Sequence, residues 1–264
     1  MRHIPRKRFG QHFLIDPGVI AAIVDAIAPS LDDVLIEIGP GLGALTRPLL
    51  PRVRSLHVVE LDRDIVARLR REYAGRIEVH AGDALKFDFS VFPRDFRVAG
   101  NLPYNISTPL LFHLLQFASR ARDFHFMLQK EVVERMVAAP STPAYGRLSV
   151  MLQRHFEMDK LFEVPPEAFE PPPKVESAVV RMRPIAPALP EGFDRDIFAE
   201  VVAAAFGQRR KTLRNSLGKL LGETAAGAEL QRLGIEPGLR AENLGVADYL
   251  RLAAALGRAR ESGG

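Results

Sequence analysis

One short segment of the chain has the residue types needed to hold an amino group carried on an aromatic base. It reads Gly100-Asn101-Leu102-Pro103-Tyr104. An Asn side-chain oxygen and a backbone carbonyl of a Pro-containing turn can accept both hydrogens of a planar –NH2, while an aromatic ring stacks on the base. Two such bonds favour a pyramidal amine, whose lone pair then points at an electrophile. The turn 101–104 therefore predicts group transfer to an exocyclic amine; an ordinary β-turn is the alternative.

A glycine-rich turn provides a second candidate site. Residues 37–43 read Glu-Ile-Gly-Pro-Gly-Leu-Gly, after an apolar run and before a helix-like stretch. Glycines such as Gly39 and Gly41 let the backbone turn sharply and approach a ligand closely, and the following helix offers unpaired N–H groups. The pattern suits a nucleotide-like ligand, and a tight turn that binds nothing is the alternative.

Two acidic residues follow the next strand-like runs. A carboxylate at Glu60 can accept both hydroxyls of a ribose, and Asp62 is either its competitor or a helix cap. Asp83, followed by Ala84, can accept a hydrogen bond from an adenine amino group, or can be a turn cap. The three loops together predict a nucleoside site, with NAD and S-adenosylmethionine (SAM) as comparable ligands at this point.

These loops need a parallel sheet to bring them together. Strand-like apolar runs alternate with helix-like stretches, which is typical of right-handed crossovers with helices on both faces. The runs are 34–38, 56–59, 77–80, 96–99 and 124–128. The helix-like stretches are 19–28, 45–50, 64–73, 109–117 and 131–138.

The pattern changes beyond residue 147. Two strand-like stretches, 148–164 and 175–182, flank a Pro-rich loop and have no helix between them, so we expect them to pair antiparallel at the sheet edge. A Pro-punctuated linker follows, and then four stretches of helical period. We expect residues 1–186 to form one domain, which holds the candidate site, and 187–264 a small all-helical second domain. The helical stretches are 197–206, 209–221, 225–233 and 247–256.

The composition excludes several kinds of chemistry. The 264 residues include no Cys, which rules out disulfides, Cys-ligated zinc and attack on a base by a thiolate. No apolar stretch is long enough for a membrane span and no secretory signal is recognisable, so we expect a cytoplasmic protein without a membrane partner. We also expect no metal cofactor, and a monomer.

The net charge of +4 is concentrated in two clusters. Positive residues precede any acidic residue at the N-terminus, and a second group around 209–219 contains no acidic residue. A solvated surface is one explanation, and contact with a polyanion is the other. The first cluster is Arg2, Arg6, Lys7 and Arg8, and the second is Arg209, Arg210, Lys211, Arg214 and Lys219.

Motifs along nearly the whole chain resemble the ribosomal RNA adenine dimethyltransferase family, most closely its small-subunit members. They include Arg-Lys-Arg-Phe-Gly-Gln-His-Phe-Leu at 6–14, Gly-Asn-Leu-Pro-Tyr-Asn-Ile-Ser-Thr-Pro at 100–109 and Phe-Glu-Pro-Pro-Pro-Lys-Val at 169–175. The segments 37–43, 128–132, 144–149 and 205–215 match in the same way. The resemblance implies an α/β class I SAM-dependent methyltransferase, with a Rossmann-like sheet and an antiparallel edge strand in a catalytic domain of residues 1–186. It also implies that the helical domain of residues 187–264 binds RNA.

The resemblance also implies an activity and a set of contacts. The activity is SAM-dependent dimethylation of two adjacent adenines near the 3′ end of 16S rRNA, within the 30S subunit or its precursor. Phe169 would stack on the adenine opposite Tyr104, or else plug the Pro-rich loop. Members of the family usually have Asn where this chain has His12. His12 would therefore contact SAM either through its side chain or through its backbone alone. The implied SAM contacts are His12, Leu14, Gly39, Gly41, Glu60, Asp83, Ala84 and Asn101.

Other functions remain open from sequence alone. The same site suits an adenine or amide methyltransferase acting on 23S rRNA, DNA or a protein glutamine. An RNA-binding assembly factor with a vestigial SAM fold is another possibility, which the intact Glu60, Asp83 and Asn101 set disfavours. A dehydrogenase has no use for the turn at 101–104.

Overall fold

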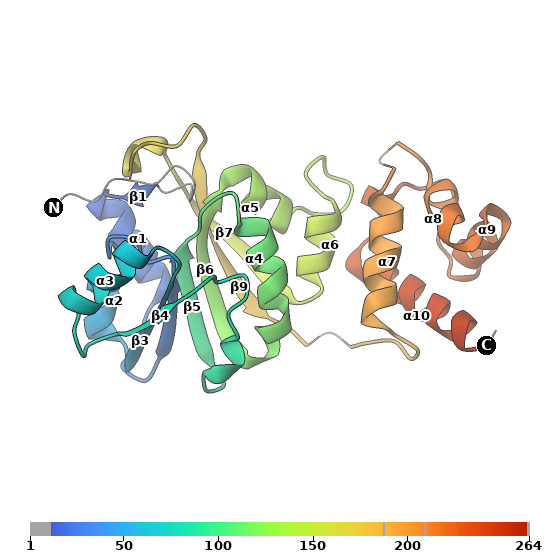
Figure 1. Ribbon diagram of the computed structural model, residues 1–264. Helices are drawn as coiled ribbons and strands as arrows, with labels where there is room; N and C mark the ends of the chain where they lie inside the picture. Colours follow the sequence, from blue (N-terminus) through green and yellow to red (C-terminus); the bar gives the residue numbers. More distant parts are fainter. Residues whose placement is uncertain (1–11, 187, 209, 263–264) are drawn as a thin grey trace. The chain divides into compact units, whose positions relative to one another are not determined.

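The computed structural model describes residues 12–186, 188–208 and 210–262 (Figure 1). Within these ranges the chain forms two compact units. The first comprises 12–133 and 156–185, and the second comprises 134–155 and the residues from 186 onward. The sequence assigned 134–155 to the catalytic domain, whereas the structure groups this segment with the C-terminal helices. The N-terminal basic cluster and Arg209 lie outside the described residues.

A mixed sheet forms the centre of the first unit, and the described residues contribute seven strands to it. Their order is β4-β3-β2-β5-β6-β9-β7; β2 to β6 run parallel, and β9 is antiparallel to both of its neighbours. The predicted antiparallel pairing at the sheet edge is thus confirmed. The strands are β2 (Val34–Ile38), β3 (Ser55–Glu60), β4 (Glu78–Ala81), β5 (Phe96–Asn101), β6 (Ala121–Gln129), β7 (Phe156–Val164) and β9 (Ser177–Pro184).

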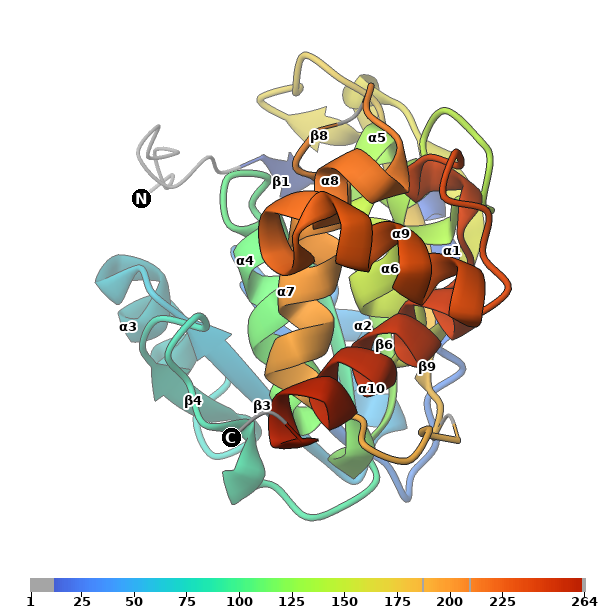
Figure 2. The ribbon, with the colours of Figure 1, turned by 90° about the vertical axis from the view of Figure 1, so that its right-hand side faces the viewer.

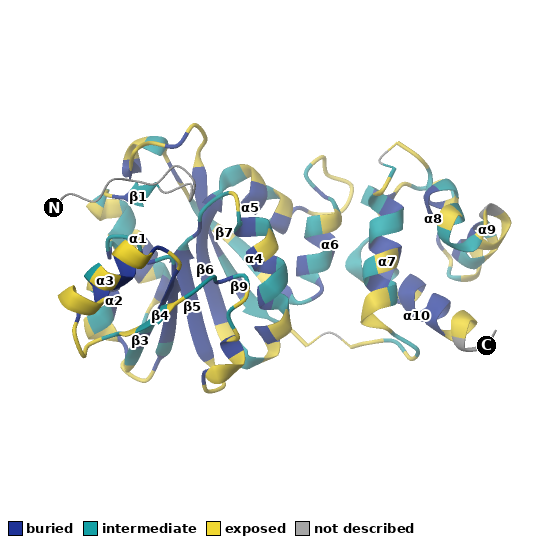
Figure 3. Ribbon diagram, viewed as in Figure 1, coloured by how far each residue is buried: buried dark blue, intermediate teal, exposed yellow. Residues whose placement is uncertain are grey.

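Helices cover both faces of this sheet (Figure 1). Apolar residues of α1, α2 and α3 pack on one face in a single cluster with β2 and β3, and α4 lies on the other face. The central strands are therefore buried on both sides, as Figure 3 shows for β5 and β6, which is why they read as continuous apolar runs. The helices of this unit are α1 (Pro17–Ile27), α2 (Thr46–Leu49), α3 (Arg63–Glu72) and α4 (Ser107–Leu114), and α5 (Lys130–Val137) begins in this unit and ends in the second.

One predicted strand is in part a helix. The stretch 148–164 contains α6 (Arg147–Gln153) and, after a short break, β7. A run such as Leu-Ser-Val-Met-Leu fits either period, so the sequence alone does not separate helix from buried strand. Tertiary contacts decide the outcome, because Ser149 donates its hydroxyl to the carbonyl of Arg135 and Val150 packs in the core of the helical unit.

A small two-stranded sheet joins the N-terminal segment to the Pro-rich loop. It pairs β1 (Phe13–Leu14) antiparallel with β8 (Phe169–Glu170), so that Leu14 lies opposite Phe169. The backbone N–H of Ile15 also donates to the carbonyl of Ala168, at 2.9 Å. The N-terminal segment is thereby fastened to the Pro-rich loop.

The second unit is helical, as predicted (Figure 2). Helix α7 contacts α6, α8 and α10, and α8 contacts α9. Their shared core includes Phe198, Val202, Leu217 and Tyr249. No helix within the described ranges combines the length and apolarity needed to cross a bilayer. The helices of this unit are α6, α7 (Arg195–Phe206), α8 (Leu213–Leu221), α9 (Glu223–Arg232) and α10 (Val246–Ser262).

A buried ion network ties β5 to its surroundings. The Arg97 guanidinium, 7% exposed, donates to both carboxylate oxygens of Asp123, at 2.9 and 2.7 Å, and to Asp33 at 2.8 Å. Burial alone would raise the pKa of Asp123, but the His125 ring, 3.6 Å away, and the hydrogen-bonded Arg97 outweigh it and lower that pKa to about 2. The network holds the strand that ends in Asn101.

Arg97→Ala should destabilise the fold by about 3–5 kcal/mol, because it leaves the buried Asp123 carboxylate without its arginine and leaves Asp33 with Arg122 alone. Urea unfolding measures this loss. Arg52→Ala is the matched control, since Arg52 is half-exposed and pairs with exposed Asp25 at 3.7 Å, and it should cost no more than about 1 kcal/mol. Equal losses in the two variants would show that the buried network is not important for stability.

Candidate active site

The carboxyl ends of the parallel strands enclose a cavity of about 300 Å³, at the low end of the ~300–1,000 Å³ typical of ligand pockets. Four loops line it, because the ends of neighbouring parallel strands meet at one sheet edge. They are the glycine turn after β2, Glu60 and Leu61 after β3, residues 82–84 after β4, and residues 101–106 after β5. Residues 12–14 form the remaining wall.

The glycine turn adopts a backbone that other residues rarely take. Gly39 has φ of 64° and Gly41 has φ of 54°, both in the left-handed region. A Cβ on Gly41 would also lie 3.2 Å from the Phe13 ring. These two residues therefore let the loop fold closely against the cavity.

Glu60 and Asp62 have separate roles. Glu60 lines the cavity and is 8% exposed; one of its oxygens accepts the backbone N–H of Asp62 at 2.8 Å. Burial raises the pKa of Glu60, against backbone hydrogen bonds that lower it. Asp62 caps α3 by accepting the N–H of Asp64 at 3.0 Å, and it does not line the cavity.

Asp83 combines two roles that the sequence had offered as alternatives. Its Oδ1 accepts the backbone N–H of Leu85 at 3.0 Å, which is a turn cap. The residue also lines the cavity together with Ala84. The cap therefore holds the side chain in place at the wall.

Asn101 is held in one orientation by the backbone of the N-terminal segment. Its Nδ2 donates to the carbonyl of His12 at 3.0 Å, which leaves Oδ1 as the amide's acceptor for a ligand. The carbonyl of Pro103 already accepts the N–H of Ile106 at 3.1 Å. The carbonyl of Leu102 is therefore the better second acceptor for an amine.

The Tyr104 side chain is held by a hydrogen bond at its hydroxyl and by a stacked ring. Its hydroxyl shares a 2.6 Å hydrogen bond with Ser177 of β9, and burial raises the pKa of this phenol. The His12 ring stacks against it with centroids 5.8 Å apart and an interplanar angle of 25°. His12 itself is held through Nδ1, which lies 2.7 Å from the carbonyl of Pro171 and donates to it. His12 thus supports the turn with both its backbone and its side chain.

The structure does not bring Phe169 to the cavity. Its side chain is 2% exposed and packs in the core cluster with Leu14, Val164 and Ala168. In this arrangement the ring plugs the Pro-rich loop, which was the alternative to stacking on a base. All the other predicted site residues line the cavity: His12, Leu14, Gly39, Gly41, Glu60, Asp83, Ala84, Asn101, Leu102, Pro103 and Tyr104.

Glu37 is a cavity residue to which the sequence assigned no role. It is 2% exposed, and one of its oxygens accepts the hydroxyl of Thr46 at 2.6 Å. Burial, opposed by this hydrogen bond, raises the pKa of Glu37 to about 7. The sequence did contain a signal for this residue, which is a carboxylate inside an apolar strand. An isolated buried charge is costly unless a partner or ligand compensates it, so such a carboxylate indicates a site.

The lining has a marked charge preference. It includes the carboxylates of Glu37, Glu60 and Asp83, and among the described lining residues none is Lys or Arg. Such a cavity favours a ligand with net positive charge and disfavours the pyrophosphate of a dinucleotide. SAM carries a positively charged sulfonium. The charge of the cavity therefore favours SAM over NAD, a choice that the glycine turn alone left open.

Comparison with known proteins agrees with this geometry. The profile of the family described as Ribosomal RNA adenine dimethylase matches residues 2–257. The chain belongs to this family. It is 64% identical over 255 residues to a protein from Thiobacillus denitrificans named Ribosomal RNA small subunit methyltransferase A, covering 96% of this chain and 98% of that protein. A protein of the same name from Nitrosospira multiformis is 59% identical, with 98% and 99% covered.

Solved structures show the same fold. A dimethyladenosine transferase from Plasmodium falciparum superposes with a TM-score of 0.79 and 27% identity, covering 91% of this chain and 96% of that one. The 23S rRNA methyltransferase ErmE gives a TM-score of 0.71 and 28% identity, with 92% and 99% covered. The fold is that of a class I methyltransferase, and the chain is an enzyme of this type, as predicted.

Glu37 should make stability fall as the pH rises. The unfolded chain ionises this residue near pH 4.5 but the folded chain only near 7, so its favourable contribution is complete below 4.5 and is lost by about pH 7. Glu37→Gln should remove this dependence and gain about 3 kcal/mol relative to the native chain across that window. Urea unfolding at several pH values measures the difference. Glu157→Gln, at an exposed position, is the control; a Glu37→Gln profile parallel to the native one would contradict the prediction.

Proposed function

We propose that this enzyme uses SAM to dimethylate the N6 amines of two adjacent adenines near the 3′ end of 16S rRNA, and so takes part in ribosome biogenesis. The observation that carries the proposal is the Asn101 turn. Its amide is oriented by the His12 carbonyl at the rim of a carboxylate-lined cavity. The names of the curated relatives support the small subunit as the location of the substrate.

The described residues fit SAM in chemistry as well as in charge. When bound, SAM supplies an electrophilic methyl group on a sulfonium. The Glu60 carboxylate can accept from the ribose hydroxyls, and Asp83 can accept from the adenine amino group of the cofactor. The backbone of the Gly39–Gly41 turn admits the ligand closely, and the buried Glu37 carboxyl adds negative potential beside a cation.

The turn itself holds the target amine. Asn101 Oδ1 and the Leu102 carbonyl accept its two hydrogens, which keeps the nitrogen lone pair out of the ring and available for attack. Positioning of this kind can supply about 7–11 kcal/mol of the barrier reduction. No strong general base is needed, because the methylated amine becomes acidic enough to lose its proton to water.

Tyr104 supports the target base from one side. Because its hydroxyl is held by Ser177, the ring presents a fixed face for stacking. An adenine reaches such a site only from a loop or after extrusion from a helix. The buried Phe169 supplies no second face in this arrangement; its stacking role would require the Pro-rich loop to rearrange.

The helical unit offers a surface for the RNA backbone. Arg210, Lys211, Arg214 and Lys219 are all exposed and form no ion pair with the described residues. Arg210, Lys211 and Arg214 lie around the start of α8, and Lys219 lies in its last turn. Exposed cations of this kind suit phosphate contacts, which fix position without reading sequence. We therefore assign rRNA binding to this unit, in the 30S subunit or its precursor, with the enzyme acting as a monomer in the cytoplasm.

Labelled SAM supplied with unmethylated small subunits, 23S rRNA and DNA in parallel tests the substrate. Nucleoside analysis should find dimethyladenosine only with the small subunits. Product on 23S rRNA alone would place the enzyme with ErmE-like activity, and binding of subunits without product would indicate an assembly factor. Either result would overturn the proposal.

Asn101→Ala should lower kcat by roughly 10², the scale of losing one preorganised polar contact. Asn101→Asp is the matched variant, because it keeps an acceptor oxygen while losing the donor to His12, so it should retain more activity than the Ala variant. Single-turnover methylation of small subunits measures both. Near-native turnover of Asn101→Ala would remove Asn101 from the mechanism.

A further inference from the structure

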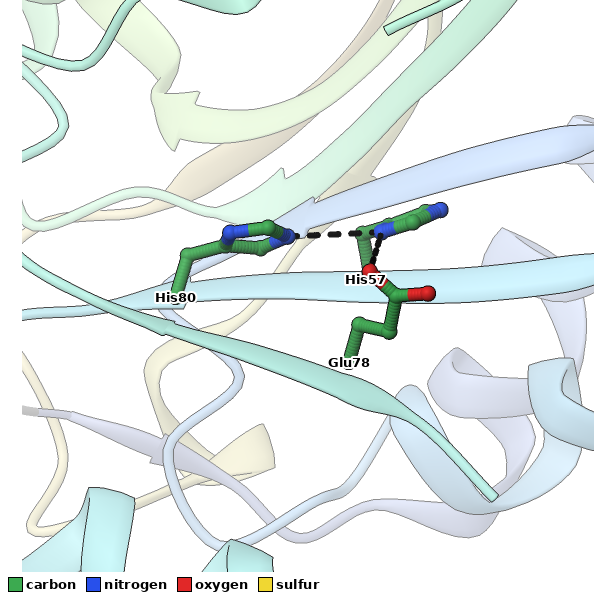
Figure 4. Close-up of side chains that lie close together, drawn as sticks. All are labelled: His57, Glu78 and His80. Atoms are coloured by element: carbon green, nitrogen blue, oxygen red, sulfur yellow. Dashed lines mark hydrogen bonds and ion pairs between the residues drawn. The ribbon is translucent and has the colours of Figure 1, made fainter. Parts of the chain in front are cut away.

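Three side chains with metal-binding atoms converge on one face of the sheet (Figure 4). They come from β3 and from β4, the strand at the sheet edge. His57 lies opposite Glu78 in the parallel register and Val59 lies opposite His80. Because side chains two apart share a face, His57, Glu78 and His80 are neighbours on the same side. None of the three lines the cavity.

The distances within this cluster are those of a coordination sphere. His57 Nδ1 lies 3.3 Å from His80 Nε2 and 3.3 Å from a Glu78 oxygen, and all three atoms lie within 4.8 Å of one another. Zinc binds imidazole nitrogen and carboxylate oxygen at about 2.0–2.2 Å, which puts ligand atoms at tetrahedral corners roughly 3.3–3.6 Å apart. Two of the three separations match that value without any rearrangement.

Hydrogen bonding alone leaves the cluster incompletely satisfied. In a neutral His57, Nδ1 either donates one proton or accepts one, according to the tautomer, so it cannot make a full hydrogen bond to both partners at 3.3 Å. A cation at the common point would instead receive a lone pair from each of the three groups. The arrangement therefore suits a metal ion better than a proton.

The surroundings favour neutral imidazoles with lone pairs available for a metal. The His57 ring lies 4.9 Å from that of Phe92, and the His80 ring lies 5.3 Å from that of Phe87. Burial against these rings lowers the pKa of both histidines, against the Glu78 charge that raises it. The Glu78 side chain is 71% exposed, so an ion can reach the site from solvent.

We propose that His57, Glu78 and His80 bind one divalent transition-metal ion, Zn²⁺ by the chemistry of the donors. Two imidazoles and one carboxylate select such a metal over Mg²⁺ or Ca²⁺, which prefer oxygen ligands only. Three protein ligands leave a fourth position for water. The ion would link the edge strand β4 to β3. These two strands lead to Asp83 and Glu60 in the cavity wall.

Competition with a chromogenic zinc chelator tests the site, using ZnCl₂ and full-length, tag-free protein treated with EDTA. The native chain should bind one Zn²⁺. His80→Asn should weaken binding by more than about 100-fold, since losing even an outer-shell partner costs about 10–100-fold. Glu78→Gln provides a second variant at an exposed position that leaves the packing intact, and it should also weaken binding.

His113→Asn is the matched control. His113 is a partly buried histidine of the same region, held by the carbonyl of Phe87 at 2.8 Å, and it lies outside the cluster. This variant should bind Zn²⁺ like the native chain. Zn²⁺ should also raise the melting temperature of the native and His113→Asn chains in a concentration-dependent way, but not that of His80→Asn.

Cobalt gives an independent readout. Co²⁺ in the native chain should show the intense visible bands of four-coordinate geometry, and these bands should be absent from His80→Asn. Zn²⁺ binding of equal strength in the native, His80→Asn and Glu78→Gln chains would overturn the proposal. So would the absence of stoichiometric binding to a native chain that is folded by circular dichroism.

Discussion

The site depends on the pairing of β5 with a parallel strand on each side. β5 is hydrogen-bonded to β2 and β6 and is buried on both faces, so its carboxyl end is fixed against theirs. Asn101 is the last residue of that strand, next to the glycine turn that follows β2. No loop has to be long or mobile for the two to meet, because the sheet already brings them together. The precision of the turn comes from rigid strands rather than from the loop.

Electrostatics give this scaffold its ligand preference. Burying Glu37 and Glu60 beside each other costs free energy, as the raised pKa of each carboxyl indicates. A cationic ligand repays part of that cost, so the same groups that weaken the empty fold favour SAM over a dinucleotide. The buried Arg97 network differs, because its charges compensate one another within the protein and need no ligand. It holds β5 in place.

The N-terminal segment has a larger role than a single ligand contact would require. His12 accepts from Asn101 through its carbonyl, stacks on Tyr104 and reaches the carbonyl of Pro171. One residue thus joins the turn after β5 to the Pro-rich loop. The backbone bond of His12 is one that any residue can supply, whereas its ring adds a contact that supports the tyrosine.

The sequence by itself determined the alternation of strands and helices, the glycine turn and the Asn101–Tyr104 turn. These are local patterns, set by apolar runs and by residues with restricted backbones. Only the tertiary structure decided that 147–153 is helical, that Asp62 caps a helix while Glu60 lines the cavity, and that Phe169 is buried opposite Leu14. The gathering of His57, Glu78 and His80 belongs to the same group. In each case the deciding contact joins residues that pattern alone does not pair, because strand register and side-chain burial arise only when the whole sheet and its helices pack.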